Sequence, residues 1–293
     1  MGRNIIKLTL LLTSLSVLFV LLGQAVGGTI GIGFAVVFAV AMNFGAYWFS
    51  DSIVLKLAGA REASREEEPD LYASVARLAE RAKLPMPKVY VVESDVPNAF
   101  ATGRSPERGV VAVNTGITRL LTRDELDGVI AHELAHIKHR DTLLSAVVAT
   151  IAGAITAIAN IGQLSLLFGG FGGDDDEDGG GLVGGLIWLF VAPIAATLIQ
   201  LGISRAREFQ ADAGGARILG DPLPLASALE KLEWYSKGQP ATTSPAVASL
   251  HIVNPLTGGG MLKLFSTHPP TEERVARLRA LARAETEGFA TVA

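Results

Sequence analysis

The segment His132-Glu133-Leu134-Ala135-His136 governs the structure expected for the rest of the chain. An α-helix has about 3.6 residues per turn, so His132 and His136 lie one turn apart on one face and offer two imidazole nitrogens to one metal ion. Glu133 lies beside them and can accept a proton from a water molecule on that ion. An uncharged hydrophobic run follows from Thr142. The segment therefore predicts a metal-activated water held close to a membrane surface.

The helix that carries this motif has its own start signal. Thr122 and Glu125 form a Ser/Thr-x-x-Glu capping box, which is typical of a helix N-terminus. Apolar residues then recur at helical spacing through the motif: Leu126, Val129, Ile130 and Leu134. The predicted helix therefore begins after Thr122 and buries one face.

The third ligand of the metal must come from another part of the chain. A catalytic zinc site uses three protein ligands and keeps one position open for water. The chain has no cysteine, so the third ligand is a histidine or a carboxylate. His139 lies about 10 Å along the helix axis from His132, too far for both to bind one ion at about 2 Å. The candidate is therefore Glu208, on a later segment.

Glu208 and His136 occupy comparable positions relative to two hydrophobic runs. Glu208 lies four residues after Ser204, and His136 lies six residues before Thr142. With a rise of about 1.5 Å per residue, both would project roughly 6 to 9 Å from the membrane on the same side if the helices stand upright. Two helices emerging side by side would bring these ligands to a common depth.

Asp212 lies one turn beyond Glu208 and could orient a ligand histidine through its second ring nitrogen. An alternative is that Glu208 and Asp212 are helix-surface carboxylates that balance Arg205 and Arg207. The spacing alone does not decide between these two interpretations.

The composition indicates a membrane protein. The chain has 293 residues, of which 49% are hydrophobic and only 18% are charged. No charged residue occurs between Lys7 and Asp51, which is long enough for two helices of roughly 20 residues each. Two further runs flank an acidic, glycine-rich loop, 169–181, which we interpret as a solvated turn. The predicted transmembrane helices are about 5–23, 29–49, 142–168 and 182–204, with a hairpin at 24–28 between the first two.

The first hydrophobic run could instead be a secretory signal peptide, but no small-x-small cleavage site closes it and a second run follows at once. Lysine and arginine near the span ends set the orientation, because they gather on the cytoplasmic side. Here they all fall on one side: Arg3, Lys7, Lys56, Arg61, Lys138, Arg140, Arg205 and Arg207. We therefore expect the soluble parts, 51–141 and 205–293, to be cytoplasmic.

The soluble parts combine helices with short strands. Helical spacing predicts helices at 70–83, 205–219, 221–234 and 271–284. Two β-branched runs, 89–92 and 110–113, predict strands, and 98–102 is a third, edge-like segment. The expected fold class is a mainly α membrane protein with four transmembrane helices and a cytoplasmic α+β, zincin-like domain that contains a small β-sheet.

Other classes of partner are disfavoured. The net charge of −4 is mild, and the basic residues are scattered, so no nucleic-acid partner is expected. The chain also lacks the Gly-x-x-x-x-Gly-Lys-Ser/Thr loop that binds nucleotide phosphates, which disfavours an ATP-driven enzyme.

These features together resemble the HtpX family of membrane zinc metalloproteases, whose catalytic domain is similar to that of the eukaryotic CAAX prenyl proteases. The resemblance covers nearly the whole chain, including the four hydrophobic spans. It rests on four motifs: Asn98-Ala99-Phe100-Ala101-Thr102-Gly103, the motif at His132, Ser204-Arg205-x-x-Glu208-x-x-x-Asp212, and Thr267-His268-Pro269-Pro270.

The resemblance implies one zinc ion per chain, held by His132, His136 and Glu208, with Glu133 as the general base. It also implies that the substrate backbone lies along an edge strand, since an extended peptide can add itself to a free sheet edge. The strand residues concerned are Asn98, Ala99, Phe100 and Ala101. His268 could donate to the oxyanion, or it could only cap the last helix; both interpretations stay open.

The implied activity is that of a zinc metalloendopeptidase, a multi-pass protein of the prokaryotic plasma (inner) membrane. Its implied substrates are polypeptides, namely misfolded or damaged membrane proteins, under heat or envelope stress. An intramembrane protease is disfavoured because charged Lys138, Arg140 and Asp141 crowd the motif. The alternative from another class is a catalytically silent membrane scaffold or chaperone with a structural metal, which would have no use for Glu133 as a base.

Overall fold

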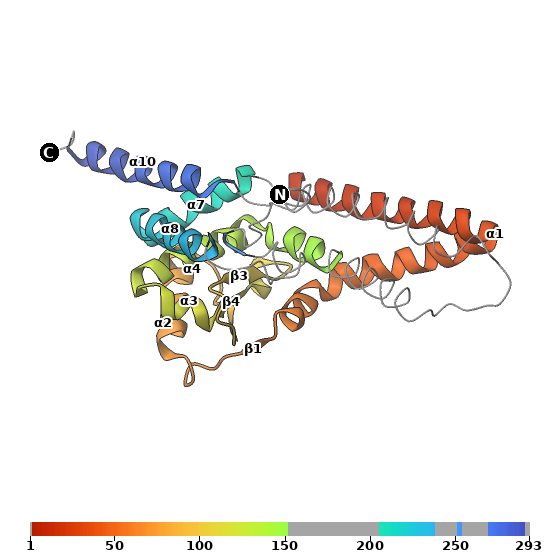
Figure 1. Cartoon of the computed structure of the whole chain (residues 1–293), viewed down its shortest axis with the longest axis horizontal. Helices are drawn as coiled ribbons and strands as arrows, with labels where there is room; N and C mark the ends of the chain where they lie inside the picture. The colour runs from red at the N-terminus through yellow and green to blue at the C-terminus, as the bar shows by residue number, and fades with distance from the viewer. Residues whose placement is uncertain (1, 152–204, 238–250, 254–268, 291–293) are drawn as a thin grey trace.

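The computed structural model describes residues 2–151, 205–237, 251–253 and 269–290. Helix α1 (Gly2–Leu57) runs out from the body of the protein and returns as a second arm (Figure 1). The arms meet at Gly27 and Gly28, where the backbone leaves helical geometry. Gly28 has a φ of 55°, which glycine adopts without steric cost. This break lies inside the loop expected between the first two spans, and the second arm continues past residue 49 to Leu57.

One helix among the described residues is long and apolar enough to cross a membrane, Gly27–Leu57. Two shorter apolar helices are Ile6–Leu21 and Thr142–Ile151. The other predicted spans, 142–168 and 182–204, and the acidic loop lie largely or wholly outside the described residues.

A mixed four-stranded sheet stands next to α1. Its strands, in the order β1-β2-β4-β3, are β1 (Ala60–Glu62), β2 (Lys88–Val92), β4 (Val110–Asn114) and β3 (Ala99–Thr102). The central strands β2 and β4 are parallel, and the two outer pairs are antiparallel. The two predicted strands and the edge position of β3 are confirmed. Strand β1 was not predicted, because its three residues include no β-branched or aromatic side chain.

Both faces of the sheet are covered. Alternate side chains of a strand point to opposite faces. Val111 and Val113 therefore pack into the core of the soluble part, whereas Val110 and Ala112 pack against the end of α1 and the helix that begins at Thr142. Burial on both faces explains why β4 is apolar without interruption until Asn114.

Among the described residues, six helices pack around the main hydrophobic core, which includes Val111 and Val113. Figure 1 shows these helices gathered around one end of the sheet. They are α2 (Pro69–Ala82), α3 (Thr115–Leu120), α4 (Arg123–His139), α7 (Arg205–Leu219), α8 (Leu223–Lys237) and α10 (Thr271–Ala290). The helices predicted from periodicity are confirmed within a few residues at each end, except that α10 continues to Ala290. The short helix α3 was not predicted.

The N-terminus of α4 is tied to α8. The predicted capping box is present, with Thr122 and Glu125 bonding each other's backbone N–H groups. Glu125 also accepts hydrogen bonds from Ser227 at 2.6 Å and Lys231 at 2.7 Å. Burial alone would raise the pKa of the Glu125 carboxyl, but these hydrogen bonds outweigh it and lower the pKa to about 2. The start of the motif-bearing helix is thus held by a charged network.

Candidate metal centre

Helix α4 presents His132 and His136 on one face, as their spacing predicts. The two Nε2 atoms lie 3.1 Å apart, and the His132 side chain is buried. The helix ends at His139, because Arg140 adopts a left-handed conformation and its N–H bonds the carbonyls of His136 and Ile137. A separate helix then begins at Thr142. The expectation of one upright helix running from the motif into the membrane is therefore wrong.

Helix α7 brings the third predicted ligand to the two histidines. Glu208 Oε2 lies 3.7 Å from His132 Nε2, and Glu208 Oε1 lies 3.8 Å from His136 Nε2. One ligand atom from each of the three residues lies within 4.8 Å of the others. Gly215 permits this approach, since a Cβ there would come within 2.8 Å of the His132 backbone nitrogen. Close packing of α7 on α4 brings the three side chains together.

Each histidine has a carboxylate at its other ring nitrogen. His132 Nδ1 lies 3.0 Å from Asp212 Oδ1, in the arrangement suggested for Asp212 from its spacing. His136 Nδ1 lies 3.1 Å from Asp141 Oδ2, a contact that sequence reasoning missed. Both carboxylates are buried. They fix the two rings so that the Nε2 atoms are the ones directed to a common point.

A buried arginine extends this network to the C-terminal helix. Arg274, on α10, is 1% exposed and donates from Nη2 and Nε to the two oxygens of Asp212 at 2.7 and 2.9 Å. Its Nη1 donates to the carbonyl of Ile252 at 2.7 Å. This residue was missed as well, because nothing in the sequence separates it from the exposed arginines of the same helix. The network lowers the pKa of Asp212 well below its ordinary value, since the pull of Arg274 outweighs burial.

Glu133 lies next to the ligands and is buried. Its Oε2 accepts a hydrogen bond from the N–H of Ala101, on β3, at 2.7 Å. Burial raises the pKa of the Glu133 carboxyl above its ordinary value; the nearby histidines and the Ala101 N–H act in the opposite direction. A carboxyl group with a raised pKa is better suited to exchange protons near neutral pH.

Strand β3 leaves one edge of its backbone turned away from β4. The Asn98 carbonyl accepts from the Asn114 N–H at 2.9 Å, so alternation places the backbone groups of Ala99 and Ala101 on the other side. The Ala101 N–H on that side reaches Glu133. The Asn98 side chain accepts from the Ile252 N–H at 3.2 Å. The predicted edge therefore runs directly past the candidate base.

Two other histidines, His139 and His268, were considered from the sequence as functional candidates. His139 does not belong to the ligand group and lines a separate pocket with Lys138 and Arg217. His268, predicted either to donate to the oxyanion or to cap the last helix, lies outside the described residues.

The electrostatics of the cluster favour a cation. Burial alone would lower the pKa of His136, but Asp141 and Glu208 outweigh it and raise the pKa to about 10. The carboxylates that hold a proton on His136 would equally attract a metal ion between the Nε2 atoms. Two imidazole nitrogens and one carboxylate are also the donor set of a common class of catalytic zinc site. The residues present therefore fit zinc.

The contact between Asp141 and His136 gives the first prediction. Changing Asp141 to Asn removes the charge that orients His136, and we expect the affinity for zinc to fall about 10- to 100-fold. Competition with a chromophoric chelator measures this affinity. Asp124→Asn, which alters an exposed carboxylate on the first turn of the same helix, serves as the control and should bind zinc as the parent does. Equal affinities in both variants would exclude an orienting role for Asp141.

Comparison with known proteins adds an independent line of argument. The family model "Peptidase family M48" matches residues 65–282. A "Protease HtpX homolog" from Thermodesulfovibrio yellowstonii is 54% identical over 95% of this chain and 98% of its own length. Proteins with the same description from Desulfatibacillum aliphaticivorans and Burkholderia ambifaria are each 51% identical, over 94% and 96% of this chain and 89% and 98% of their own lengths.

Among solved structures, the "Crystal Structure of S. mikatae Ste24p" aligns with 90% of this chain at 18% identity and a TM-score of 0.47. The alignment spans 61% of that longer chain. The family model covers most of this chain, and the HtpX homologue from Thermodesulfovibrio yellowstonii matches it over nearly its whole length. The chain therefore belongs to peptidase family M48 and, within it, to the HtpX proteases.

Proposed function

We propose that this chain is a zinc-dependent endopeptidase of the prokaryotic plasma membrane, with its metal centre on the cytoplasmic side. One observation carries the proposal: His132, His136 and Glu208 converge on one point beside the buried carboxyl of Glu133. Membership of a peptidase family supports it. A silent scaffold with a structural metal is not favoured, because it would gain nothing from burying a carboxyl group with a raised pKa at this point.

His132, His136 and Glu208 would hold the zinc ion, and Asp212 and Asp141 would keep both imidazole rings in position. When bound, zinc lowers the pKa of a water molecule toward about 7 and polarises a carbonyl group. Glu133 accepts the proton of the attacking water as the oxygen bonds to the scissile carbonyl carbon. The same carboxyl then delivers this proton to the leaving amine as the C–N bond breaks.

The substrate backbone would lie along the free side of β3, whose residues run past Glu133. An extended peptide can pair with the backbone groups of Ala99 and with the Ala101 carbonyl, whereas the Ala101 N–H donates to Glu133. This mode of binding does not depend on side chains. Asn98 comes just before this stretch, and Phe100 lies between its two alanines. Such recognition suits polypeptides of many sequences, as misfolded or damaged membrane proteins would be. His268 remains a candidate donor to the oxyanion.

Four spans would hold the enzyme in the bilayer. Large apolar side chains of the second arm of α1 are exposed: Ile30 and Phe34 are each 76% exposed, and Val37 is 69% exposed. A bilayer would cover this surface, which a soluble protein rarely leaves open. The basic residues near the predicted span ends support a cytoplasmic position for the metal centre.

The test is metal removal from the full chain purified in a mild detergent. Treatment with a strong zinc chelator should reduce hydrolysis of casein to the level of a protein-free control, and one equivalent of zinc per chain should restore it. The restored activity should saturate at that equivalence, because the site offers a single set of three ligands. Hydrolysis that continues unchanged in the metal-free protein would exclude the proposed function.

A further inference from the structure

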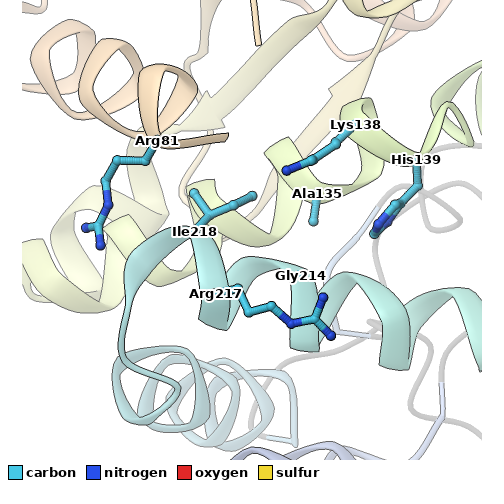
Figure 2. A pocket seen from close by; sticks show the side chains of 7 residues that line it. All are labelled: Arg81, Ala135, Lys138, His139, Gly214, Arg217 and Ile218. Carbon is cyan, nitrogen blue, oxygen red and sulfur yellow. The ribbon is translucent and has the colours of Figure 1, made fainter. Parts of the chain in front are cut away.

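A second pocket lies beside the ends of three helices, away from the metal ligands. It has a volume of about 130 Å³. Figure 2 shows that its side chains come from the end of α2, the end of α4 and the second half of α7. Ala135 and Gly214 form its apolar wall, where α7 packs so closely on α4 that a Cβ at Gly214 would meet the Ala135 Cβ at 2.9 Å.

The pocket is strongly basic. Four of its lining residues are Arg81, Lys138, His139 and Arg217, and no acidic residue lines it. Within the described ranges, no ion pair forms at Arg81, Lys138 or Arg217, whereas seven arginines elsewhere in these ranges have a carboxylate partner. Three basic side chains therefore line a small cavity whose lining includes no counter-charge.

Helix dipoles explain in part why basic residues without ion-pair partners gather here. Each of the three cations lies in the last turns of its helix, where the partial negative charge of the C-terminus favours a basic side chain. That partial charge is only about half an elementary charge per helix. The three ends therefore offset about half of the three full charges, and the rest remains available to a ligand. His139 is affected too, since burial and then the cations His136, Lys138 and Arg217 lower its pKa against the opposing pull of Asp141.

We propose that this pocket binds a phosphate group, either the headgroup of an anionic phospholipid or free phosphate. The Arg217 guanidinium supplies planar pairs of N–H donors that match phosphate oxygens, and Lys138 adds a point charge. Figure 2 shows Arg81 on the opposite side of Ile218, where it adds positive charge to the far wall of the pocket. A cavity of about 130 Å³ suits a small anion of this kind. Lys138 stands only four residues before Thr142, where the apolar helix Thr142–Ile151 begins. The lipid source therefore rests on the proposed membrane position, whereas the phosphate chemistry does not.

Binding is measured on the full chain, delipidated in a nonionic detergent. One arm adds inorganic phosphate against sodium chloride at equal ionic strength and pH, and follows the midpoint of thermal unfolding. The other arm adds dioleoylphosphatidylglycerol or dioleoylphosphatidylcholine and counts retained lipid by native mass spectrometry. A bound anion relieves repulsion among three helix ends, so the midpoint should rise with phosphate and not with chloride. Neither readout depends on peptidase activity, so failure here leaves the proposed function intact.

Arg81→Glu and Arg217→Glu are the test variants, because both residues lie farther from the predicted span ends than Lys138 does. Each should weaken binding at least about tenfold, since each puts a negative charge in place of a positive one at the wall of the pocket. Arg283→Glu, the same change on the exposed end of α10, is the matched control and should bind as the parent does. Arg217→Lys keeps the charge and should retain most of the binding, which separates loss of the site from misfolding.

The two arms identify the source of the phosphate group. A response to phosphatidylglycerol alone assigns the site to a lipid headgroup, a response to inorganic phosphate alone assigns it to a free anion, and both responses support the site. Absence of any response in the parent overturns the proposal. Responses that persist in Arg81→Glu and Arg217→Glu as fully as in Arg283→Glu overturn it too, because the anion would then bind elsewhere.

Discussion

Replacing Glu133 by Gln should lower kcat/KM for peptide hydrolysis about 10²- to 10⁴-fold while zinc stays bound, because a glutamine amide cannot accept the proton of the attacking water. The substitution preserves shape, and the Gln carbonyl can still accept the hydrogen bond from Ala101 N–H. It also removes a charge that burial disfavours, so the fold should not weaken. Casein hydrolysis and metal content of the purified protein are the two measurements.

Asp124→Asn is again the matched control, since it neutralises an exposed carboxylate on the same helix without approaching the ligands. Its activity should equal that of the parent. If Glu133→Gln cleaves as fast as this control, the base lies elsewhere in the site. If the variant loses its zinc together with its activity, the carboxyl serves the metal and not the proton transfer.

The parts of the site that the sequence predicts are those with local signals. The spacing of His132 and His136 requires only that their segment be helical, and the capping box at Thr122 marks where that helix begins. Asp212 follows from Glu208 by the same rule of one helical turn. The break between α4 and the helix at Thr142 could not be predicted, because the left-handed conformation of Arg140 has no sequence signal.

The parts that were missed depend on how elements pack. Asp141 reaches His136 only because the chain turns back at Arg140, which brings a residue outside the helix beneath the ring. The burial of Arg274 depends on the docking of α10 against α7 and the Ile252 segment. Its neighbours Arg277 and Arg279 have the same residue type and are more than half exposed. Position in the tertiary structure, and not residue type, selects the arginine that matters.

Arg274 provides the prediction with the largest expected effect on stability. Arg274→Met leaves the Asp212 carboxylate buried without its cationic partner, and breaking a buried pair in this way costs about 3–5 kcal/mol. Arg279→Met is the control on the same helix: that arginine forms an exposed ion pair with Glu230, which is worth about 0–1 kcal/mol. Denaturant titration in detergent micelles measures the free energy of unfolding for both variants.

The substitution Arg274→Met should also change how the free energy of unfolding depends on pH, in a direction that the pKa of Asp212 determines. The pKa of Asp212 in the folded protein lies below its ordinary value of 3.8, so the charged pair contributes stability above that value and the contribution is lost as the pH falls. Removing Arg274 raises the pKa of Asp212. The free energy of unfolding of Arg274→Met should therefore fall less steeply in acid than that of the parent, and an unchanged slope would contradict the assignment.

A second substitution separates stability from the support of the metal. In Arg274→Met/Asp212→Leu the buried charge is gone on both sides, so much of the lost stability should return, as it does when buried ion pairs are replaced by apolar residues. The affinity for zinc should be low in this double variant even where its stability has returned, because His132 now lacks the carboxylate at its Nδ1. Recovered stability together with weak zinc binding would establish Asp212 as a residue that positions His132 independently of the stability of its ion pair with Arg274. Recovery of both stability and zinc affinity would reduce the role of the Asp212–Arg274 pair to holding α10 in place.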